Sequence, residues 1–439
     1  MDRPWRDRGA WLPALVRSAF HVRRHRTSWP GFGMDASRAL ADLALCPDVG
    51  LRRMAPHARP VARARRLRWS TMVHPLDPFS FGDGRPTLRN RTVVAAMTNK
   101  QSHADGVLSD EEIRWLLRRA EGGFGIVTTA AAHVDEGGQG WEGEMGVWGD
   151  HQLPRLTELA DGLRSRGAVS LVQIFHGGLR APRAVTGQQP VSASDVNDQG
   201  AEEPARALTE SEVEEVVVAF VEAAVRCEQA GFDGVELHGA HGYLVAQFLG
   251  TKTNRRTDAW GGDLSGRAAF LKAIVDGVRA ATSPEFLLAV RLSPQIDAMG
   301  IRLAESLELA TWLPAWGVDL LHISCWDAFQ GAPDEPDDPR TLTRRFRTAL
   351  PEGYPLLSTG AIWDGAEATY VLGEGADLVG VARVAIGHPA WPEGLAKADY
   401  APARPPFSPE ALAAADLSPV FIEYMRRWKG FVTDGRSAD

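Results

Sequence analysis

The sequence is poor in cysteine, and this scarcity excludes several classes of protein. Its 439 residues include three cysteines, Cys46, Cys227 and Cys325, which lie far apart and form no Cys-x-x-Cys pair. This excludes a cysteine-ligated iron–sulfur cluster or zinc ribbon and gives no framework of disulfides. No apolar run approaches the roughly 18 residues that a membrane-spanning helix needs. We therefore expect a cytoplasmic protein with no membrane partner.

Basic residues are scarce over most of the chain. The net charge is −8, yet residues 1–71 contain fifteen arginines and five aspartates with no lysine or glutamate, so the remainder is strongly acidic. An acidic body disfavours nucleic acid as a partner. Arginine-rich starts occur in transit peptides and in arms that bind nucleic acid or lipid. The weak periodicity of residues 1–71 favours a disordered leader, or a segment that is not part of the native enzyme, over a targeting segment.

From Asp77 onward the chain alternates between apolar runs and helical patterns. Residues 79–90 are predicted to form a small hairpin. Thr209, Glu212 and Gly231 are capping residues typical of a helix over 207–231. Continuous apolar runs are typical of parallel strands that are buried on both faces. The eight predicted strands are 91–98, 124–134, 168–178, 232–240, 285–293, 318–326, 354–362 and 376–383.

Eight such units predict an α/β fold, a (β/α)8 TIM barrel over residues 72–404 with a short N-terminal hairpin. An open doubly wound sheet would carry a Gly-x-Gly-x-x-Gly fingerprint after its first strand, and none is present there. Residues 405–439 are predicted to form a helical tail. The long loop over 179–207 is a candidate lid or substrate loop.

The strongest functional signal is the group His238, His241 and Tyr243 at the end of the fourth predicted strand. In a barrel of this type the chemistry lies at the carboxyl ends of the strands. The two histidines have three interpretations: ligands of a metal-dependent lyase or hydrolase, histidines buried for structural reasons, or two donors to one substrate oxygen. A tyrosine with an ordinary pKa near 10 stays protonated at neutral pH, so Tyr243 is a candidate proton donor.

Other strand ends point to a cofactor that carries a phosphate. Gly360 and the pair Ala382 and Arg383 end the last two strands, where barrels of this kind bind phosphate. Gln173 and Arg291 belong to strands that end at the same mouth. The cluster over 254–258 is predicted to anchor the loop that carries Tyr243. A non-catalytic binding module tethered by the basic leader is a further alternative.

The segment over 231–271 closely resembles the old yellow enzyme family of FMN-dependent NADH:flavin oxidoreductases and ene-reductases. The resemblance covers about residues 76–388 in the family's order. It includes LRNRTVVAAMT, GGFGIVTTAAAHV, SLVQIFHGG, LLAVRLS, LLSTGAI and ADLVGVAR. It implies FMN at the barrel mouth, with NADH or NADPH as the reductant.

The resemblance also implies residue roles. Gly360, Ala382 and Arg383 would bind the FMN phosphate, and Gln173 and Arg291 the flavin pyrimidine. Thr98 would donate to the flavin O4, and Ala131 would pack beside the ring. His238 and His241 would bind an electron-withdrawing oxygen of a small-molecule substrate, while Tyr243 would protonate the substrate carbon and metal would have no role.

The implied reaction is the reduction of an activated C=C bond, such as that of an enone or nitroalkene, with a demethylase-type flavoenzyme of the same family as an alternative. Substrate specificity is expected at Asn99, Lys100 and the loops over 179–207 and 326–340. Asn99 and Lys100 stand where some relatives carry an active-site aromatic residue. The oligomeric state stays open between a monomer and a homo-oligomer.

Overall fold

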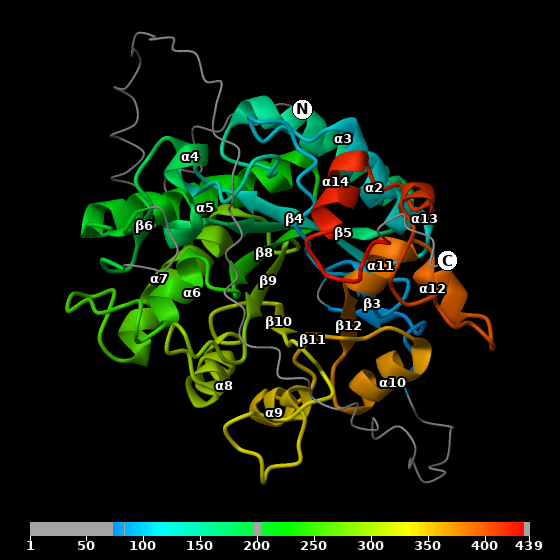
Figure 1. The fold of residues 1–439 in the computed structure, drawn as a ribbon. Coiled ribbons are helices and arrows are strands. Elements are labelled where there is room, and N and C mark those ends of the chain that lie inside the picture. Colours follow the sequence, from blue (N-terminus) through cyan, green and yellow to red (C-terminus); the bar gives the residue numbers. More distant parts are fainter. Residues whose placement is uncertain (1–72, 83, 197–202, 434–439) are drawn as a thin grey trace.

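A closed barrel of parallel strands forms the centre of the protein (Figure 1). The computed structural model describes residues 73–82, 84–196 and 203–433, so the predicted leader over 1–71 lies outside the described residues. Around the barrel the strand order is β10-β11-β12-β3-β4-β5-β8-β9. The predicted (β/α)8 barrel is confirmed. Within the described ranges, no helix is long and apolar enough to cross a membrane.

All eight barrel strands fall inside the predicted apolar runs. They are β3 (Thr92–Val94), β4 (Ile126–His133), β5 (Val169–Phe175), β8 (Gly234–Gly239), β9 (Leu287–Leu292), β10 (Leu320–Ser324), β11 (Leu356–Thr359) and β12 (Leu378–Val381). Nearly every residue in them is buried, because side chains on one face fill the barrel and those on the other pack against helices.

The helices surround the barrel, as Figure 1 shows. Those following successive strands are α2 (Asp110–Glu121), α3 (Leu153–Ser165), α5 (Glu210–Ala230), α7 (Leu264–Ala281), α8 (Leu303–Trp312), α9 (Leu342–Ala349), α10 (Gly365–Gly373) and α11 (Arg383–Gly387). The predicted caps of α5 are present: Thr209 accepts from the Glu212 N–H, and Gly231 ends the helix with a left-handed φ of 93°.

Short elements occupy the loops at the strand ends. They are η5 (Glu136–Gly138), η6 (Asp150–Gln152), η7 (Gly178–Arg180), α4 (Arg183–Thr186), β6 (Val191–Ser192), β7 (Arg206–Ala207), α6 (Leu244–Leu249) and α12 (Trp391–Leu395). Strands β6 and β7 pair with each other, so the long loop predicted over 179–207 has secondary structure of its own.

The predicted hairpin closes one end of the barrel. Strands β1 (Phe79–Ser80) and β2 (Thr87–Leu88) pair antiparallel, and Phe79 and Phe81 pack against the apolar cluster inside that end. Arg85 forms an ion pair with Asp319, just before β10, at 2.8 Å. The hairpin therefore covers the amino ends of the strands and leaves the carboxyl ends open.

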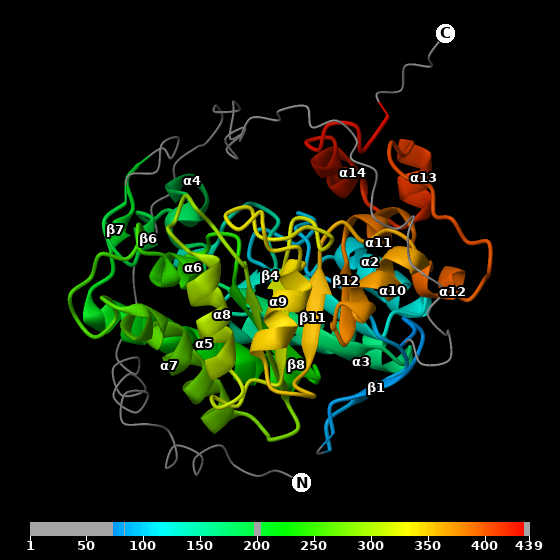
Figure 2. The same cartoon turned by 90° about the horizontal axis from the view of Figure 1, so that it is seen from below.

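Residues 405–433 lie at the other end of the barrel from β1 (Figure 2). They contain α13 (Pro409–Ala414) and α14 (Pro419–Met425). Phe421 packs edge-to-face on Trp115 of α2, with ring centroids 5.4 Å apart. Arg119 of α2 is fully buried and donates to the carbonyls of Ala385 and Ala415, which ties α11 and α13 to the barrel wall.

Candidate active site at the carboxyl ends of the strands

His238 lies near the end of β8 and faces the barrel mouth. Its ring is only 3% exposed, and Nδ1 has no hydrogen-bond partner within the described residues. The ring of His241 lies perpendicular to it, with centroids 4.9 Å apart. Burial, and then the proximity of His241 and of the Arg291 cation, lowers the pKa of His238 well below its usual value. His238 is therefore neutral at physiological pH, with one ring nitrogen left for a ligand.

His241 is held by the ends of two neighbouring strands. Its backbone is left-handed, with φ of 57°, and its N–H donates to the hydroxyl of Ser293 after β9. Its Nε2 lies 2.7 Å from the Ser324 hydroxyl at the end of β10. The ring is open to solvent at the mouth but loses hydration on its inner side. This partial burial, followed by the charges of Arg291 and other cations, lowers its pKa well below the usual value.

Ser324 connects His241 with Arg291, a link that the sequence analysis did not predict. Arg291 Nη2 donates to the Ser324 hydroxyl at 3.0 Å. The hydroxyl hydrogen is then available to His241 Nε2, which places the proton of a neutral His241 on Nδ1. Both histidines can thus donate to one substrate oxygen while uncharged.

Tyr243 stands directly before α6 and packs among aromatic rings. Its ring centroid lies 4.9 Å from Phe175 and 5.0 Å from His238. Trp141, from the loop after β4, lies 6.3 Å away on another side. The three residues of the predicted HGAHGY group are therefore brought together, and Phe175 and Trp141 complete a wall that sequence reasoning did not identify.

Arg291 is buried beneath this group. It is 4% exposed, its Nη1 donates to the Ala96 carbonyl at 3.3 Å, and its Nε has no partner in the described part of the chain. Burial lowers the pKa of the guanidinium and Glu236 opposes the shift, so the group keeps its charge at neutral pH. One buried donor thus remains for a ligand at the barrel mouth.

A chain of polar side chains crosses the barrel interior below Arg291. Gln173 donates to Glu236 Oε1 at 2.7 Å, and Glu236 Oε2 lies 2.6 Å from His322 Nδ1. His322 Nε2 lies 2.7 Å from the Thr359 hydroxyl. Burial alone would raise the pKa of Glu236, but His322, Arg291 and Gln173 together lower it. The network fixes Gln173 and keeps a carboxylate close to Arg291.

The predicted flavin contacts on the first two strands lie next to Gln173. Ala131 of β4 is buried and stands opposite Gln173 in the strand register, and Thr98 follows β3 as a half-buried residue. Asn99 is turned away, because its side chain donates to buried Glu112 of α2 at 2.8 Å. Its expected part in substrate specificity is therefore wrong: Asn99 fixes the loop that carries Thr98.

Gly360, Ala382 and Arg383 meet where β11 and β12 end. A side chain at Gly360 would place its Cβ 2.5 Å from the Cys325 carbonyl, so only glycine fits there. Arg383 begins α11 and is exposed, without a side-chain hydrogen bond or ion pair to any described residue. An unpaired arginine beside these backbone turns is suited to binding an anion.

The cluster over 254–258 is structural, as predicted. Asn254 donates to the carbonyls of Phe248 and Trp260, and Arg256 pairs with Asp258. Within the described ranges no group of three or more His, Cys, Asp or Glu side chains could hold a metal ion.

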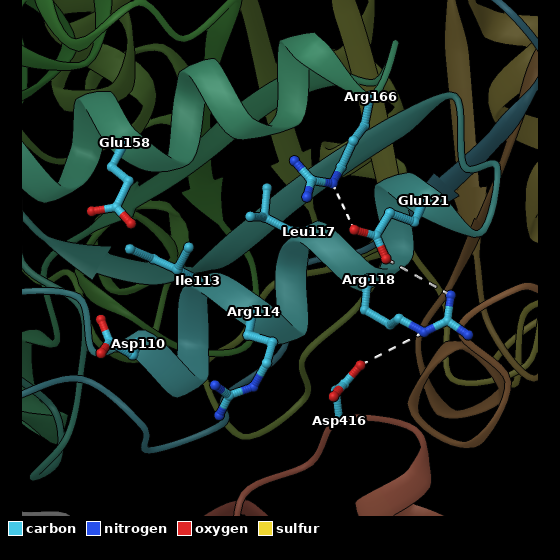
Figure 3. Close-up of a pocket in the computed structure, with 9 residues that line it drawn as sticks. All are labelled: Asp110, Ile113, Arg114, Leu117, Arg118, Glu121, Glu158, Arg166 and Asp416. Atoms are coloured by element: carbon cyan, nitrogen blue, oxygen red, sulfur yellow. Dashed lines mark hydrogen bonds and ion pairs between the residues drawn. The ribbon is translucent and has the colours of Figure 1, made fainter.

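A separate pocket lies on the outer wall of the barrel, between α2 and α3 (Figure 3). Its lining charges largely satisfy one another: Glu121 pairs with Arg166 at 2.8 Å, and Arg118 pairs with Asp416 at 3.6 Å. None of the strand-end residues lines it. We therefore place the candidate site at the barrel mouth.

Comparison with known proteins agrees with this geometry. Residues 76–401 match the family described as the NADH:flavin oxidoreductase / NADH oxidase family. A probable NADH-dependent flavin oxidoreductase of Bacillus subtilis (strain 168) is 40% identical over 72% of this chain and 86% of its own length. An NADPH dehydrogenase of Listeria monocytogenes serotype 4b is 32% identical over 71% of this chain and 91% of its own.

A solved structure of an old yellow enzyme homologue from Zymomonas mobilis is also similar. It superposes with a TM-score of 0.68 at 27% identity, over 77% of this chain and 96% of that one. Some longer relatives match only in part, since the chain spans 33% to 51% of their length.

Proposed function

Because this chain belongs to the NADH:flavin oxidoreductase / NADH oxidase family, of the old yellow enzyme type, we propose that it reduces an activated carbon–carbon double bond. FMN is the cofactor of this family, and NADH or NADPH is its reductant. The observation that carries the proposal is the convergence of His238, His241 and Tyr243 above the buried cation Arg291.

The residues at the mouth fit FMN. Arg291 Nε is a buried donor without a partner among the described residues, and Arg383 is an unpaired cation beside the close-packed turn at Gly360. Arg383, Gly360 and Ala382 would hold the phosphate. Arg291 and Gln173 would hold the pyrimidine end of the ring, and Thr98 and Ala131 would lie along its edge. When bound, FMN supplies the hydride chemistry that no side chain of the protein provides.

The side chains then bind, polarise and protonate the substrate. His238 and His241, both neutral, would donate to its electron-withdrawing oxygen and stabilise the negative charge that develops there. Tyr243, 5.0 Å from His238 between ring centroids, would hold a proton on its hydroxyl beside the substrate α-carbon. Arg291 keeps positive charge beneath the site without taking part in proton transfer.

Tyr243→Phe tests this assignment. We expect reduction of the bound flavin by NAD(P)H to be unchanged and reduction of an enone to slow by about 10²- to 10⁴-fold, because only the second half-reaction needs the proton. Stopped-flow absorbance measures each half-reaction separately. Tyr370→Phe, in α10 on the outer wall, is the matched control and should change neither rate. Equal slowing of both half-reactions by Tyr243→Phe would contradict the proposed role.

A further inference from the structure

Arg180 is an unpaired cation at the barrel mouth that the proposed reaction does not use. It is the last residue of η7 and is exposed, and its guanidinium carbon lies 5.8 Å from the centroid of the Tyr243 ring. Its side chain makes no hydrogen bond or ion pair with any residue that the structure describes. An arginine that faces a proposed proton donor without an acidic partner is available to an anionic ligand.

A buried glutamine fixes the turn that carries Arg180. Gln247 of α6 accepts from the Leu179 N–H at 3.1 Å and donates to the carbonyls of Gly177 and Gly242, at 3.2 and 2.9 Å. A Cβ on Gly178 would lie 2.3 Å from Gln247 Oε1, so the turn packs directly against this amide. One side chain thereby holds the turn after β5 against the loop that carries Tyr243. The backbone position of Arg180 relative to Tyr243 is therefore fixed.

Positive charge dominates the mouth around Arg180. Burial, and then several cations that include Arg291 and Arg180, lower the pKa of both His238 and His241. The carboxylate of Glu236 is buried and already shared between Gln173 and His322. No described acidic side chain forms an ion pair with Arg180, so a substrate anion would meet an unpaired cation beside Tyr243.

We propose that the preferred substrates are activated alkenes that carry a carboxylate, and that Arg180 binds this carboxylate beside Tyr243. The inference rests on the proposed function and specifies its substrate class. His238 and His241 hold the activating oxygen, and the carboxylate lies on the side of the substrate that faces Tyr243. Arg180 is a specificity-determining residue, because it contacts a group that does not react.

The test uses two alkenes that differ in one charge, monomethyl fumarate and dimethyl fumarate. We expect the FMN-loaded wild-type protein to favour the monoacid in kcat/KM. Arg180→Gln should lower kcat/KM for the monoacid by about 10- to 100-fold, the usual worth of a hydrogen bond to a charged group, and leave the diester nearly unchanged. Arg180→Lys, which keeps the charge and loses the planar fork, should fall between the two.

Arg114→Gln is the matched control, because Arg114 is an exposed arginine on the outer wall (Figure 3) and its loss changes the net charge equally. It should leave the ratio of the two substrates at the wild-type value. A wild-type protein without preference for the monoacid, or an Arg180→Gln variant that keeps the preference, overturns the inference. So does an Arg180→Gln variant that mainly slows flavin reduction by NAD(P)H, since Arg180 would then serve the phosphates of the nicotinamide dinucleotide.

A binding assay separates this inference from the proposed function. Titration of the FMN-loaded protein with 4-hydroxybenzoate and with its methyl ester, followed by flavin absorbance, reports anion recognition without turnover. Suppose that wild type reduces neither alkene and still binds 4-hydroxybenzoate at least about tenfold more tightly than the methyl ester, with Arg180→Gln abolishing the difference. The proposed reaction then fails and the anion site stands. Equal binding of acid and ester by wild type and Arg180→Gln overturns the anion site.

Discussion

His176, which follows β5, shows how burial of one titratable side chain makes stability depend on pH. Its ring is buried, and Nδ1 accepts a hydrogen bond from the Gly178 N–H at 3.0 Å. Burial lowers the pKa of His176 to about 4. A protonated ring could not accept this bond, so the folded protein requires the neutral form.

Acidification should therefore destabilise the protein between about pH 6.5 and 4. In this window residue 176 is protonated in the unfolded chain and unprotonated in the folded chain, so the free energy of unfolding falls as the pH falls. Above about pH 6.5 the full stability is present. Replacing His176 by Gln should make the slope shallower by up to about 1.4 kcal/mol per pH unit.

Urea unfolding at several pH values measures this slope. His103→Asn, at an exposed position, is the control and should keep the wild-type slope. An unchanged slope in His176→Gln would show that residue 176 does not take up the proton. Part of the slope should persist in any case, because burial also lowers the pKa of His133 to about 4.

At the same scale, the sequence predicted those site residues that stand in recognisable groups. The sequence HGAHGY, residues 238–243, predicted that His238, His241 and Tyr243 are neighbours. Ser324 was missed because a serine at the end of an apolar strand has no distinctive pattern, although its position at a strand end is a signal that could have been used. Asn99 was misassigned because sequence does not tell which way a side chain turns after a strand, and buried Glu112 decides it.

Among the elements, α11 is tied to the barrel wall by one buried arginine. Arg119 of α2 donates to the carbonyls of Ala385, Ile386 and Ala415, and its guanidinium carbon lies 4.2 Å from the Trp115 ring centroid. These acceptors belong to α11, which starts at Arg383, and to the end of α13. The proposed phosphate-binding end of the barrel is thus braced from the outer wall.

Arg119→Leu should lower the free energy of unfolding by about 2–5 kcal/mol, because it leaves buried carbonyls without donors. It should also weaken FMN binding, measured by the flavin released on dilution, since α11 carries Arg383. Arg118→Leu, at the preceding residue of the same helix, loses only surface ion pairs and should cost less than about 1 kcal/mol. Equal effects of the two substitutions would contradict the bracing role.

The predicted elements were accurate where long apolar runs and capping residues coincide, as in α5. The predicted bounds were less accurate for short strands and helices. The first barrel strand was expected over 91–98, but only Thr92–Val94 forms a strand, which pairs with β12 along its length and with β4 at Val93 and Val94. Helix α11 has five residues, too few for a periodic pattern to reveal.

For the whole molecule, stability and chemistry lie at opposite ends of the barrel. Phe81 packs edge-to-face on Phe79, with centroids 5.0 Å apart, over the apolar cluster that the hairpin closes. Phe81→Ala should lower the free energy of unfolding by about 1–3 kcal/mol and leave kcat per bound FMN unchanged. Thermal unfolding and steady-state kinetics at saturating FMN measure the two quantities. A lowered kcat would show that the hairpin end reaches the catalytic face.

The pairing of β12 with β3 joins Val379 to Thr92, which belong to the last and the first barrel strands in the sequence. Proposed flavin contacts lie on both sides of this seam, with Thr98 after β3 and Arg383 after β12. A chain emerging from the ribosome therefore holds no complete flavin site until its eighth strand has been made. If the proposed contacts hold FMN, we expect flavin capture late in biosynthesis, and a translation product cut short before residue 378 should leave the ribosome colourless.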